Sequence, residues 1–431
     1  MLNKILQELQ NNHVFLTGSA GTGKSFLTNR VIDEYKLQSK EVISLGSTGI
    51  SAVNIGGMTI HSFFVFGISS SLEELVYNDK RNKKRLNELK KILQSIDLIV
   101  IDEISMVSAD LLDMIRYRID SMEFKGKILF VGDFFQLPPV SKRANTSNLF
   151  SNRLYAFESE SWSYFAPKTI ELTDIKRTKD KEFAKILSQI RFGICNSEVM
   201  EYLYTLYHNQ DIYKNEPTYL FGRNIEVDMI NQSSIEELNG KEYCFYTDVE
   251  NSANIDKKRL NNWVELLPIS RELTLKAGVP VLFTVNKWGR FMNGERGVVK
   301  VVEDDFVVVE KSGEYIRVEK HEFEMQTIKA EDDGKIIHTT LATAKQFPLK
   351  PAYAVTIHKS QGMSIDRLVC NVDYIFAPSQ FYVAISRAVT PKNLKIDYNR
   401  GNFESYIKRV IRVDNRVKEF YQKMQDENSY L

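Results

Sequence analysis

The sequence has few cysteines, and their spacing excludes several classes of protein. The chain holds three in 431 residues, Cys195, Cys244 and Cys370, and no two of them form a C-x-x-C pair. This arrangement argues against a zinc site and against a small disulfide-stabilised scaffold, so we expect a protein of a reducing interior.

An excess of charge and a long hydrophobic run are missing as well. The sequence has 57 lysines and arginines against 56 aspartates and glutamates, so its formal net charge of +1 creates no global field for a polyanion or a membrane surface. Any nucleic acid must therefore be bound by a local groove. No apolar run is long enough to span a membrane, and the start MLNKILQELQ lacks the features of a secretory signal. We expect a cytoplasmic protein, nucleoid-associated if the source is bacterial, without a targeting signal or a membrane partner.

Four short apolar runs alternate with helical patterns between His13 and Val140: HVFLTG, EVISLG, DLIVIDE and KILFVGD. This alternation predicts an α/β fold with a parallel sheet that is covered on both faces. Ligands of such sheets bind at the carboxyl ends of the strands. The 43% hydrophobic content allows sizeable cores, and the length suggests about two to four domains.

The first apolar run leads into GSAGTGKS, which fills the pattern G-x-x-x-x-G-K-S. The glycines let backbone N–H groups turn toward phosphate oxygens, and the helix that follows adds the positive end of its dipole. We expect Lys24 to reach the β and γ phosphates of a nucleotide and Ser25 to hold Mg²⁺. The expected nucleotide contacts are Gly18, Gly21, Thr22, Gly23, Lys24 and Ser25.

Two further signals follow later strands. IVIDEISM places Asp102 and Glu103 at the end of a buried strand, where Asp102 is suited to hold Mg²⁺ through water and Glu103 to polarise an attacking water. VGDFFQLPPV follows the next strand, and its Gln136 is expected to sense the γ phosphate. Pro138 and Pro139 stiffen this segment, as suits a lever between the nucleotide and a second ligand.

Six segments in order resemble the Pif (petite integration frequency) family of superfamily-one DNA helicases, which are relatives of the RecD type. They are GSAGTGKS, STGISAVNIGGMTIHSFF, DEISM, GDFFQLPPV, YAVTIHKSQGMS and FYVAISRAV. The stretch SMVSADLLDMIRYRID also resembles that family's own signature. The resemblance covers nearly the whole chain and implies an ATP-dependent DNA helicase that translocates 5′ to 3′ on single-stranded DNA and unwinds duplex DNA.

The resemblance further implies two RecA-like domains with parallel sheets, with ATP between them and single-stranded DNA across both. We expect the first RecA-like domain at 1–165, with a basic helical subdomain inserted at about 66–96. The second spans 166–277 and 346–403, a small β-barrel is inserted at 278–345, and 404–431 is a C-terminal helical segment. Lysines and arginines near Lys84 suit either a solvated helix face or a subdomain that lies beside a phosphate backbone.

Two arginines match family positions that meet the γ phosphate. Arg387 in VAISRA matches the arginine finger, and Arg177 in ELTDIKRT matches the second such arginine. Arginines that arrive on closure stabilise transition-state charge, although either one could instead be an ion-pair partner. The expected catalytic residues are Lys24, Glu103, Gln136, Arg177 and Arg387.

Other family positions are implied to line the DNA strand. They are Thr48, His61, Ser62, Thr356, His358, Lys359 and Ser360. Hydroxyls, imidazoles and backbone amides make short-range phosphate contacts that let a strand slide. Phe63, Phe64 and Pro138 are available to stack on or wedge against bases, although an isolated aromatic is as readily a core residue.

ATP and Mg²⁺ are the implied cofactors, and single-stranded and forked duplex DNA are the implied partners. Guanine quadruplex DNA is a further candidate, and we expect the chain to act as a monomer. Relatives usually carry an adenine-reading glutamine well upstream of the phosphate loop, and neither Gln7 nor Gln10 matches its place. The alternatives are a nucleotide-switched binding module, a translocase that does not unwind, and an RNA-directed enzyme. The two arginines and the paired segments STGIS…TIHS and TIHKSQG favour a motor.

Overall fold

The computed structural model divides the chain into two compact units. It describes residues 1–67, 69–139, 153–214, 217–287, 289–330 and 336–429. The first unit comprises Met1–Asp174, Gln326–Thr340 and Glu419–Leu431, and the second comprises Ile175–Met325 and Leu341–Lys418. Among the described residues, no helix is long and apolar enough to cross a membrane.

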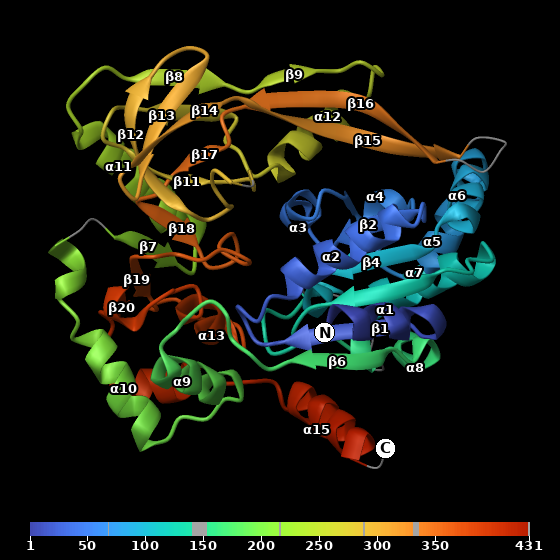
Figure 1. Cartoon of the computed structure of the whole chain (residues 1–431), viewed down its shortest axis with the longest axis horizontal. Coiled ribbons are helices and arrows are strands. Elements are labelled where there is room, and N and C mark those ends of the chain that lie inside the picture. The colour runs from blue at the N-terminus through green and yellow to red at the C-terminus, as the bar shows by residue number, and fades with distance from the viewer. Residues whose placement is uncertain (68, 140–152, 215–216, 288, 331–335, 430–431) are drawn as a thin grey trace. The chain divides into compact units, whose positions relative to one another are not determined.

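A six-stranded parallel sheet forms the centre of the first unit, in the order β3-β2-β4-β5-β1-β6. Figure 1 shows these strands with helices around them in the blue-to-green part of the chain. The strands are β1 (Val14–Gly18), β2 (Val42–Gly46), β3 (Met58–Thr59), β4 (Leu98–Asp102), β5 (Lys127–Val131) and β6 (Lys168–Leu172). The apolar runs of the sequence form β1, β2, β4 and β5, and their parallel direction brings their carboxyl ends to one edge.

Helices cover both faces of this sheet. They are α1 (Leu2–Asn11), α2 (Lys24–Leu37), α3 (Gly49–Asn54), α4 (Ile60–Phe63), α5 (Leu72–Asp79), α6 (Lys83–Ser95), α7 (Ala109–Ser121) and α8 (Glu160–Phe165), with short 3₁₀ turns η1 (Ile104–Met106) and η2 (Ala156–Glu158). Val14 and Leu16 pack in one cluster with residues of α1 and α2. The Phe15 ring meets Trp162 of α8, with the ring centroids 5.2 Å apart. Burial on both faces explains why the strands are continuously apolar.

The end of the first unit differs from the expected boundary at residue 165. β6 pairs in parallel with the whole of β1, from Val14 opposite Lys168 to Gly18 opposite Leu172. The segment that we expected to open the second domain is therefore the sixth strand of the first sheet. An isolated strand signal does not reveal which sheet the strand joins, because its partner is far away in sequence.

A buried ion pair fixes α5, in the basic insertion, to α7. Arg118 of α7 is 1% exposed and donates from Nη1 and Nη2 to the two carboxylate oxygens of Asp79 at 2.5 and 2.6 Å. Its Nε donates to the Phe64 carbonyl oxygen at 3.0 Å. The guanidinium thereby joins three segments of the first unit.

Replacing Arg118 by alanine is expected to lower the free energy of unfolding by about 3–5 kcal/mol, because Asp79 and the Phe64 carbonyl lose a buried partner. Chemical unfolding of the full chain measures this change. The control is Lys90→Ala, which breaks an ion pair with Glu123 whose side chains are 41% and 64% exposed, and should cost no more than about 1 kcal/mol. Equal losses in the two variants would contradict a structural role of Arg118.

The second unit has a four-stranded parallel sheet in the order β18-β7-β19-β20. Its strands are β7 (Thr218–Phe221), β18 (Ala354–Thr356), β19 (Leu368–Asn371) and β20 (Leu394–Asp397). The helices of this part of the chain are α9 (Lys181–Arg191), α10 (Ser197–Tyr207), α11 (Asn224–Glu237), α12 (Lys257–Leu266), α13 (Gln380–Ile385) and α14 (Phe403–Val410), with 3₁₀ turns η3 (Asp211–Lys214) and η4 (Pro391–Asn393).

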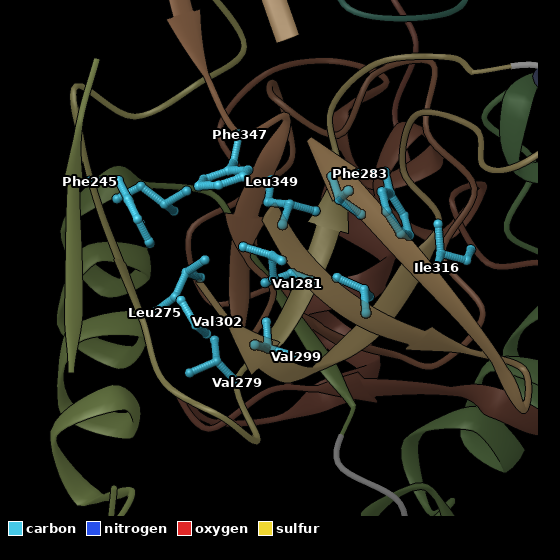
Figure 2. Packing of buried hydrophobic residues seen from close by; sticks show 14 of the residues in the cluster. Phe245, Leu275, Val279, Val281, Phe283, Val299, Val302, Ile316, Phe347 and Leu349 are labelled. Atoms are coloured by element: carbon cyan, nitrogen blue, oxygen red, sulfur yellow. The ribbon is translucent and has the colours of Figure 1, made fainter. Parts of the chain in front are cut away.

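Antiparallel strands lie between β7 and β18 in the sequence. They are β8 (Tyr243–Tyr246), β9 (Asp248–Glu250), β10 (Glu272–Leu275), β11 (Pro280–Phe283), β12 (Arg296–Val302), β13 (Phe306–Lys311), β14 (Glu314–Glu319), β15 (His321–Ala330), β16 (Ile336–Gln346) and β17 (Leu349–Pro351). Five of them form one sheet in the order β14-β13-β12-β11-β17. Figure 2 shows Val281, Val299 and Leu349 gathered in its core, where each is at most 1% exposed. The same cluster includes Phe245 of β8 and Leu275 of β10, so the β8–β10 pair closes this core.

The C-terminal segment, which was predicted to be helical, contains two helices. α14 ends at Val410 and α15 spans Asn415–Ser429. Tyr406 and Ile407 of α14 are buried. From Glu419 onward, α15 belongs to the first unit.

Candidate active site

The phosphate loop joins β1 to α2 at the carboxyl edge of the first sheet. The backbone φ values of Gly18, Gly21 and Gly23 are 147°, 78° and 94°, which residues other than glycine rarely adopt. A Cβ on Gly18 would lie 2.5 Å from the Leu172 carbonyl oxygen. Thr22 closes the loop by donating from its hydroxyl to the Ser19 carbonyl oxygen at 2.9 Å. The loop thus has the glycine-dependent shape that phosphate cradles require.

Lys24, the first residue of α2, lies across this loop. Its Nζ donates to the carbonyl oxygens of Gly18 at 2.7 Å and Ser19 at 3.1 Å. Ser25 follows it in the first turn and is exposed. A positive charge, an exposed serine hydroxyl and the start of a helix therefore lie close together, which suits a polyphosphate and its cation.

Asp102 ends β4 at the same edge, and Glu103 follows it directly. The backbone N–H of Glu103 donates to Asp102 Oδ1 at 2.9 Å, and Glu103 has a φ of 53°, an uncommon conformation for a residue with a side chain. Burial and the Glu103 carboxylate raise the pKa of Asp102, whereas Lys24 lowers it. A nearby divalent cation would favour the ionised forms of both carboxylates. These donors fit the Mg²⁺ of a bound nucleotide.

Gln136 follows β5 in a tightly bonded turn. Its backbone N–H donates to the Asp133 carbonyl oxygen at 2.8 Å, and the N–H of Phe135 donates to Asp133 Oδ1 at 3.1 Å. Gln136 is 5% exposed, Pro139 is buried and Pro138 is partly exposed. The turn therefore holds Gln136 in one place on the first unit.

Arg177 lies in the second unit and donates hydrogen bonds to two other segments of that unit. Its Nε donates to Ser364 Oγ at 2.9 Å and its Nη1 to the Ser386 carbonyl oxygen at 2.7 Å. Burial and the Arg387 guanidinium lower the pKa of Arg177 to about 9. Arg177 stays charged at neutral pH, but at an electrostatic cost that an approaching anion would relieve.

Arg387 follows α13 and is 1% exposed. Its Nε donates to the Val383 carbonyl oxygen at 2.9 Å, and its Nη1 donates to the Ser360 carbonyl oxygen at 3.3 Å. These acceptors are neutral carbonyl groups. Both arginines thus contact the segment 360–364, which follows the predicted strand contacts His358 and Lys359.

The strand-lining residues predicted in the first unit lie around α3 and α4. Thr48 and Ser51 exchange hydrogen bonds, with the Thr48 N–H donating to Ser51 Oγ at 2.9 Å and the Ser51 N–H to Thr48 Oγ1 at 3.1 Å. His61 and Ser62 are exposed on α4. These two side chains are accessible to a phosphate backbone.

Phe63 and Phe64 differ from the expected base-stacking role. They are 4% and 0% exposed, and their rings meet edge-on with centroids 4.9 Å apart. The Phe64 ring also stacks on Phe66, with centroids 5.4 Å apart. Both residues therefore lie in the core of the first unit. A base needs a free ring face to stack on, and neither ring offers one in this structure.

Four residues of the second unit were predicted to contact the DNA strand, and two of them have hydroxyls that face inward. Thr356 Oγ1 accepts from the Lys359 N–H at 3.3 Å, and the Ser360 hydroxyl donates to the Ile357 carbonyl oxygen at 2.8 Å. Thr356 and Ser360 are 4% and 0% exposed. They shape the turn, whereas Lys359 is exposed and His358 is partly exposed.

Comparison with known proteins identifies the family of this chain. Residues 1–201 match the model of the PIF1-like helicases, and residues 299–411 match a second model described as helicase. The ATP-dependent DNA helicase Pif1 of Campylobacter jejuni is 41% identical over 437 residues, which cover 98% of this chain and 97% of the relative. The chain belongs to the PIF1-like helicase family. As a member of this superfamily-one family, it is an ATP-dependent DNA helicase.

Solved structures of PIF1-like helicases share the fold. Bacteroides Pif1 in complex with ADP-AlF4 aligns with a TM-score of 0.85 at 28% identity, covering 99% of this chain and 96% of that one. Bacteroides Pif1 bound to single-stranded DNA aligns with a TM-score of 0.65 at 26% identity, covering 99% and 97%. Parallel and antiparallel sheets in one α/β chain are therefore a property of these relatives as well.

Phe376 is a candidate strand contact in this PIF1-like helicase that the sequence did not reveal. It is 61% exposed, and its ring stacks on His358 with centroids 6.2 Å apart and planes 20° from parallel. Its backbone is held by Gln380, whose Oε1 accepts from the Phe376 N–H at 2.9 Å. Phe376 lies between two recognisable segments, so only spatial proximity to His358 singles it out.

Gln10 lies away from the phosphate loop. It lines a cavity with Asp97 and Lys127, which lie at the amino ends of β4 and β5. The phosphate loop is at the carboxyl ends of the same sheet, so Gln10 is on the opposite edge. Within the described ranges, no group of three or more His, Cys, Asp or Glu side chains forms a separate metal site.

Proposed function

We propose that this PIF1-like helicase moves 5′ to 3′ along single-stranded DNA and separates duplex DNA at a fork. Family resemblance supports the direction. One observation supports motor activity most directly. Arg177 donates a hydrogen bond to Ser364 and Arg387 donates one to Ser360, and both serines lie close in sequence to the proposed DNA contacts His358 and Lys359. On arrival of ATP the arginines turn to the γ phosphate, and the segment 360–364 is free to shift along the strand.

The proposed architecture assigns a RecA-like domain to each parallel sheet. The first includes β6 and carries α5 and α6 as its inserted basic subdomain, and the second is interrupted by the antiparallel strands β8 to β17. Closure of RecA-like domains on a nucleotide, followed by hydrolysis and opening, moves two strand contacts in alternation. One copy of the chain is the proposed acting form, and guanine quadruplex DNA is a further proposed substrate.

In the proposed nucleotide site, Lys24 contacts the β and γ phosphates and Glu103 orients the attacking water. Ser25 and Asp102 hold Mg²⁺, which when bound neutralises charge on the phosphates. Gln136 contacts the γ phosphate and couples its presence to the surface that binds the DNA strand. Arg177 and Arg387 add positive charge when the transition state forms.

The proposed strand path has two chemically different contacts in the second unit. Lys359 offers a charge to a phosphate, and Phe376 offers an exposed ring face to a base. On the first unit, Thr48, His61 and Ser62 supply neutral contacts. Such contacts are short-range, so a strand can slide past them between steps.

Alanine variants should separate these two contacts. Lys359→Ala is expected to lower the salt dependence of single-strand affinity by about one unit of log–log slope. Phe376→Ala should weaken binding by about 1–3 kcal/mol with an unchanged slope. Fluorescence anisotropy titrations over a range of salt concentrations measure both quantities. Parent-like affinity and slope in both variants would remove this surface from the strand path.

ATP hydrolysis with and without single-stranded DNA tests whether the strand and nucleotide sites are coupled. The proposal predicts that the strand raises kcat, because strand binding shifts the segment that Arg177 and Arg387 hold. A single-stranded RNA of the same sequence serves as the comparison for substrate class. Equal rates with and without DNA would contradict the motor and favour a nucleotide-switched binding protein.

A further inference from the structure

The C-terminal helix α15 reaches the turn that carries Gln136. The Tyr421 hydroxyl lies 2.8 Å from Thr17 Oγ1 and accepts from the backbone N–H of Phe134 at 3.2 Å. It also lies 3.4 Å from Asp133 Oδ1. Tyr421 is 4% exposed and Thr17 and Asp133 are 0% exposed, so this network is shielded from water. All four residues belong to the first unit.

The same hydroxyl therefore joins the ends of two neighbouring strands. Thr17 directly precedes Gly18 of the phosphate loop at the end of β1. Asp133 and Phe134 follow β5 and begin the turn that ends at Gln136. β1 and β5 pair only up to Leu16 opposite Val131. A backbone hydrogen bond from the Gly132 N–H to the Leu16 carbonyl oxygen at 3.1 Å continues this pairing, and Tyr421 adds a side-chain link further along, between Thr17 and Phe134.

Aromatic packing holds Tyr421 in this position. Its ring stacks on Phe135, with centroids 4.6 Å apart and planes 24° from parallel. The preceding Phe420 stacks on Phe157 at 4.4 Å and meets Phe134 edge-on at 5.4 Å. Packing of this kind fixes the ring without the hydroxyl, so the ring and the hydroxyl have separable effects.

We propose that Tyr421 is a positioning residue for ATP hydrolysis that fixes the Gln136 turn against the phosphate loop. The inference rests on the proposed role of Gln136. The Asp133 carboxylate is bonded both to the Phe135 N–H and, through the tyrosine, to β1. Loss of the hydroxyl leaves the Phe134 N–H with one partner fewer and lets the turn shift relative to Gly18. Small displacements of positioning groups cost turnover more than ground-state binding.

The test compares Tyr421→Phe, Gln136→Ala and the double variant in the full chain. Tyr421→Phe keeps the stacked ring and is expected to lower the kcat of DNA-stimulated ATP hydrolysis about 10-fold, with KM for ATP within about 2-fold of the parent. Because both residues act through one turn, the double variant should be no slower than Gln136→Ala alone. Single-strand affinity should not change.

Tyr164→Phe is the matched control, because it removes a hydroxyl that donates to Asp120 at 2.9 Å on the same unit. It should keep the parent kcat. Thr17→Val removes the other hydroxyl of the network with nearly the same shape and is expected to lower kcat as Tyr421→Phe does. It therefore tests the inference even if the tyrosine variant is too unstable to purify.

The outcomes separate the inference from the function on which it rests. If Gln136→Ala keeps the parent kcat, the proposed role of Gln136 fails. If Gln136→Ala is slow but Tyr421→Phe and Thr17→Val turn over like the parent, the inference alone is overturned. Multiplicative losses in the double variant also overturn it, since Tyr421 would then act independently of Gln136. A shared loss in kcat without a change in KM supports it.

Discussion

Lys24→Ala is expected to reduce ATP hydrolysis to below about 1% of the parent rate while single-strand affinity stays within about 2-fold. The ammonium already lies over the phosphate loop, bonded to the carbonyl oxygens of Gly18 and Ser19. In the proposed site it exchanges these acceptors for phosphate oxygens whose negative charge grows in the transition state. Alanine keeps the helix start but supplies no charge.

Steady-state ATPase assays and strand-binding titrations on one preparation measure both expectations. Lys36→Ala is the matched control, because Lys36 is exposed in the last turn of the same helix and should leave both quantities unchanged. Retained hydrolysis in Lys24→Ala would refute the assignment of the phosphate loop. Lost strand affinity would instead indicate that the variant is misfolded or that the strand path includes α2.

Arg387→Ala is expected to lower kcat about 10³-fold with ATP affinity within about 3-fold of the parent. An arginine that stabilises only the transition state contributes to turnover and little to ground-state binding. In this structure the guanidinium is bonded to the carbonyl oxygens of Val383 and Ser360, so it must leave these partners to act. The proposed finger role therefore ties turnover to a rearrangement of the segment 360–364, which follows the proposed DNA contacts His358 and Lys359.

A nucleotide titration together with single-turnover hydrolysis separates binding from chemistry in this variant. Arg409→Ala, at an exposed position of α14, controls for the loss of one positive charge. Weakened ATP binding with an unchanged kcat would contradict the finger role and assign Arg387 to ground-state binding.

The parts that the sequence could predict are those in which local chemistry dictates geometry. The φ values of 147° and 94° at Gly18 and Gly23 require glycine, so the phosphate loop can be recognised from the amino-acid sequence. The buried strands are recognisable because both of their faces are covered. Family resemblance then supplied roles for Arg177 and Arg387 that no local pattern indicates.

Side-chain direction and distant contacts could not be predicted in the same way. An aromatic such as Phe63 gives the same signal whether it meets a base or the core, and tertiary packing buries it. The hydroxyls of Thr356 and Ser360 bond to their own turn. Tyr421 reaches Thr17 across 404 residues, and Phe376 stacks on His358 only in the folded unit. These contacts depend on the tertiary fold rather than on residues that are adjacent in the sequence.

Strand displacement from duplexes with either a 5′ or a 3′ single-stranded overhang tests the proposed directional motor. The duplex sequence, the overhang length and the ATP concentration are kept equal, and Lys24→Ala serves as the inactive reference. We expect ATP-dependent displacement of the 5′-overhang substrate and little displacement of the 3′-overhang substrate. Displacement from the 3′ overhang alone would reverse the proposed direction, and DNA-stimulated hydrolysis without displacement from either would contradict unwinding by this chain.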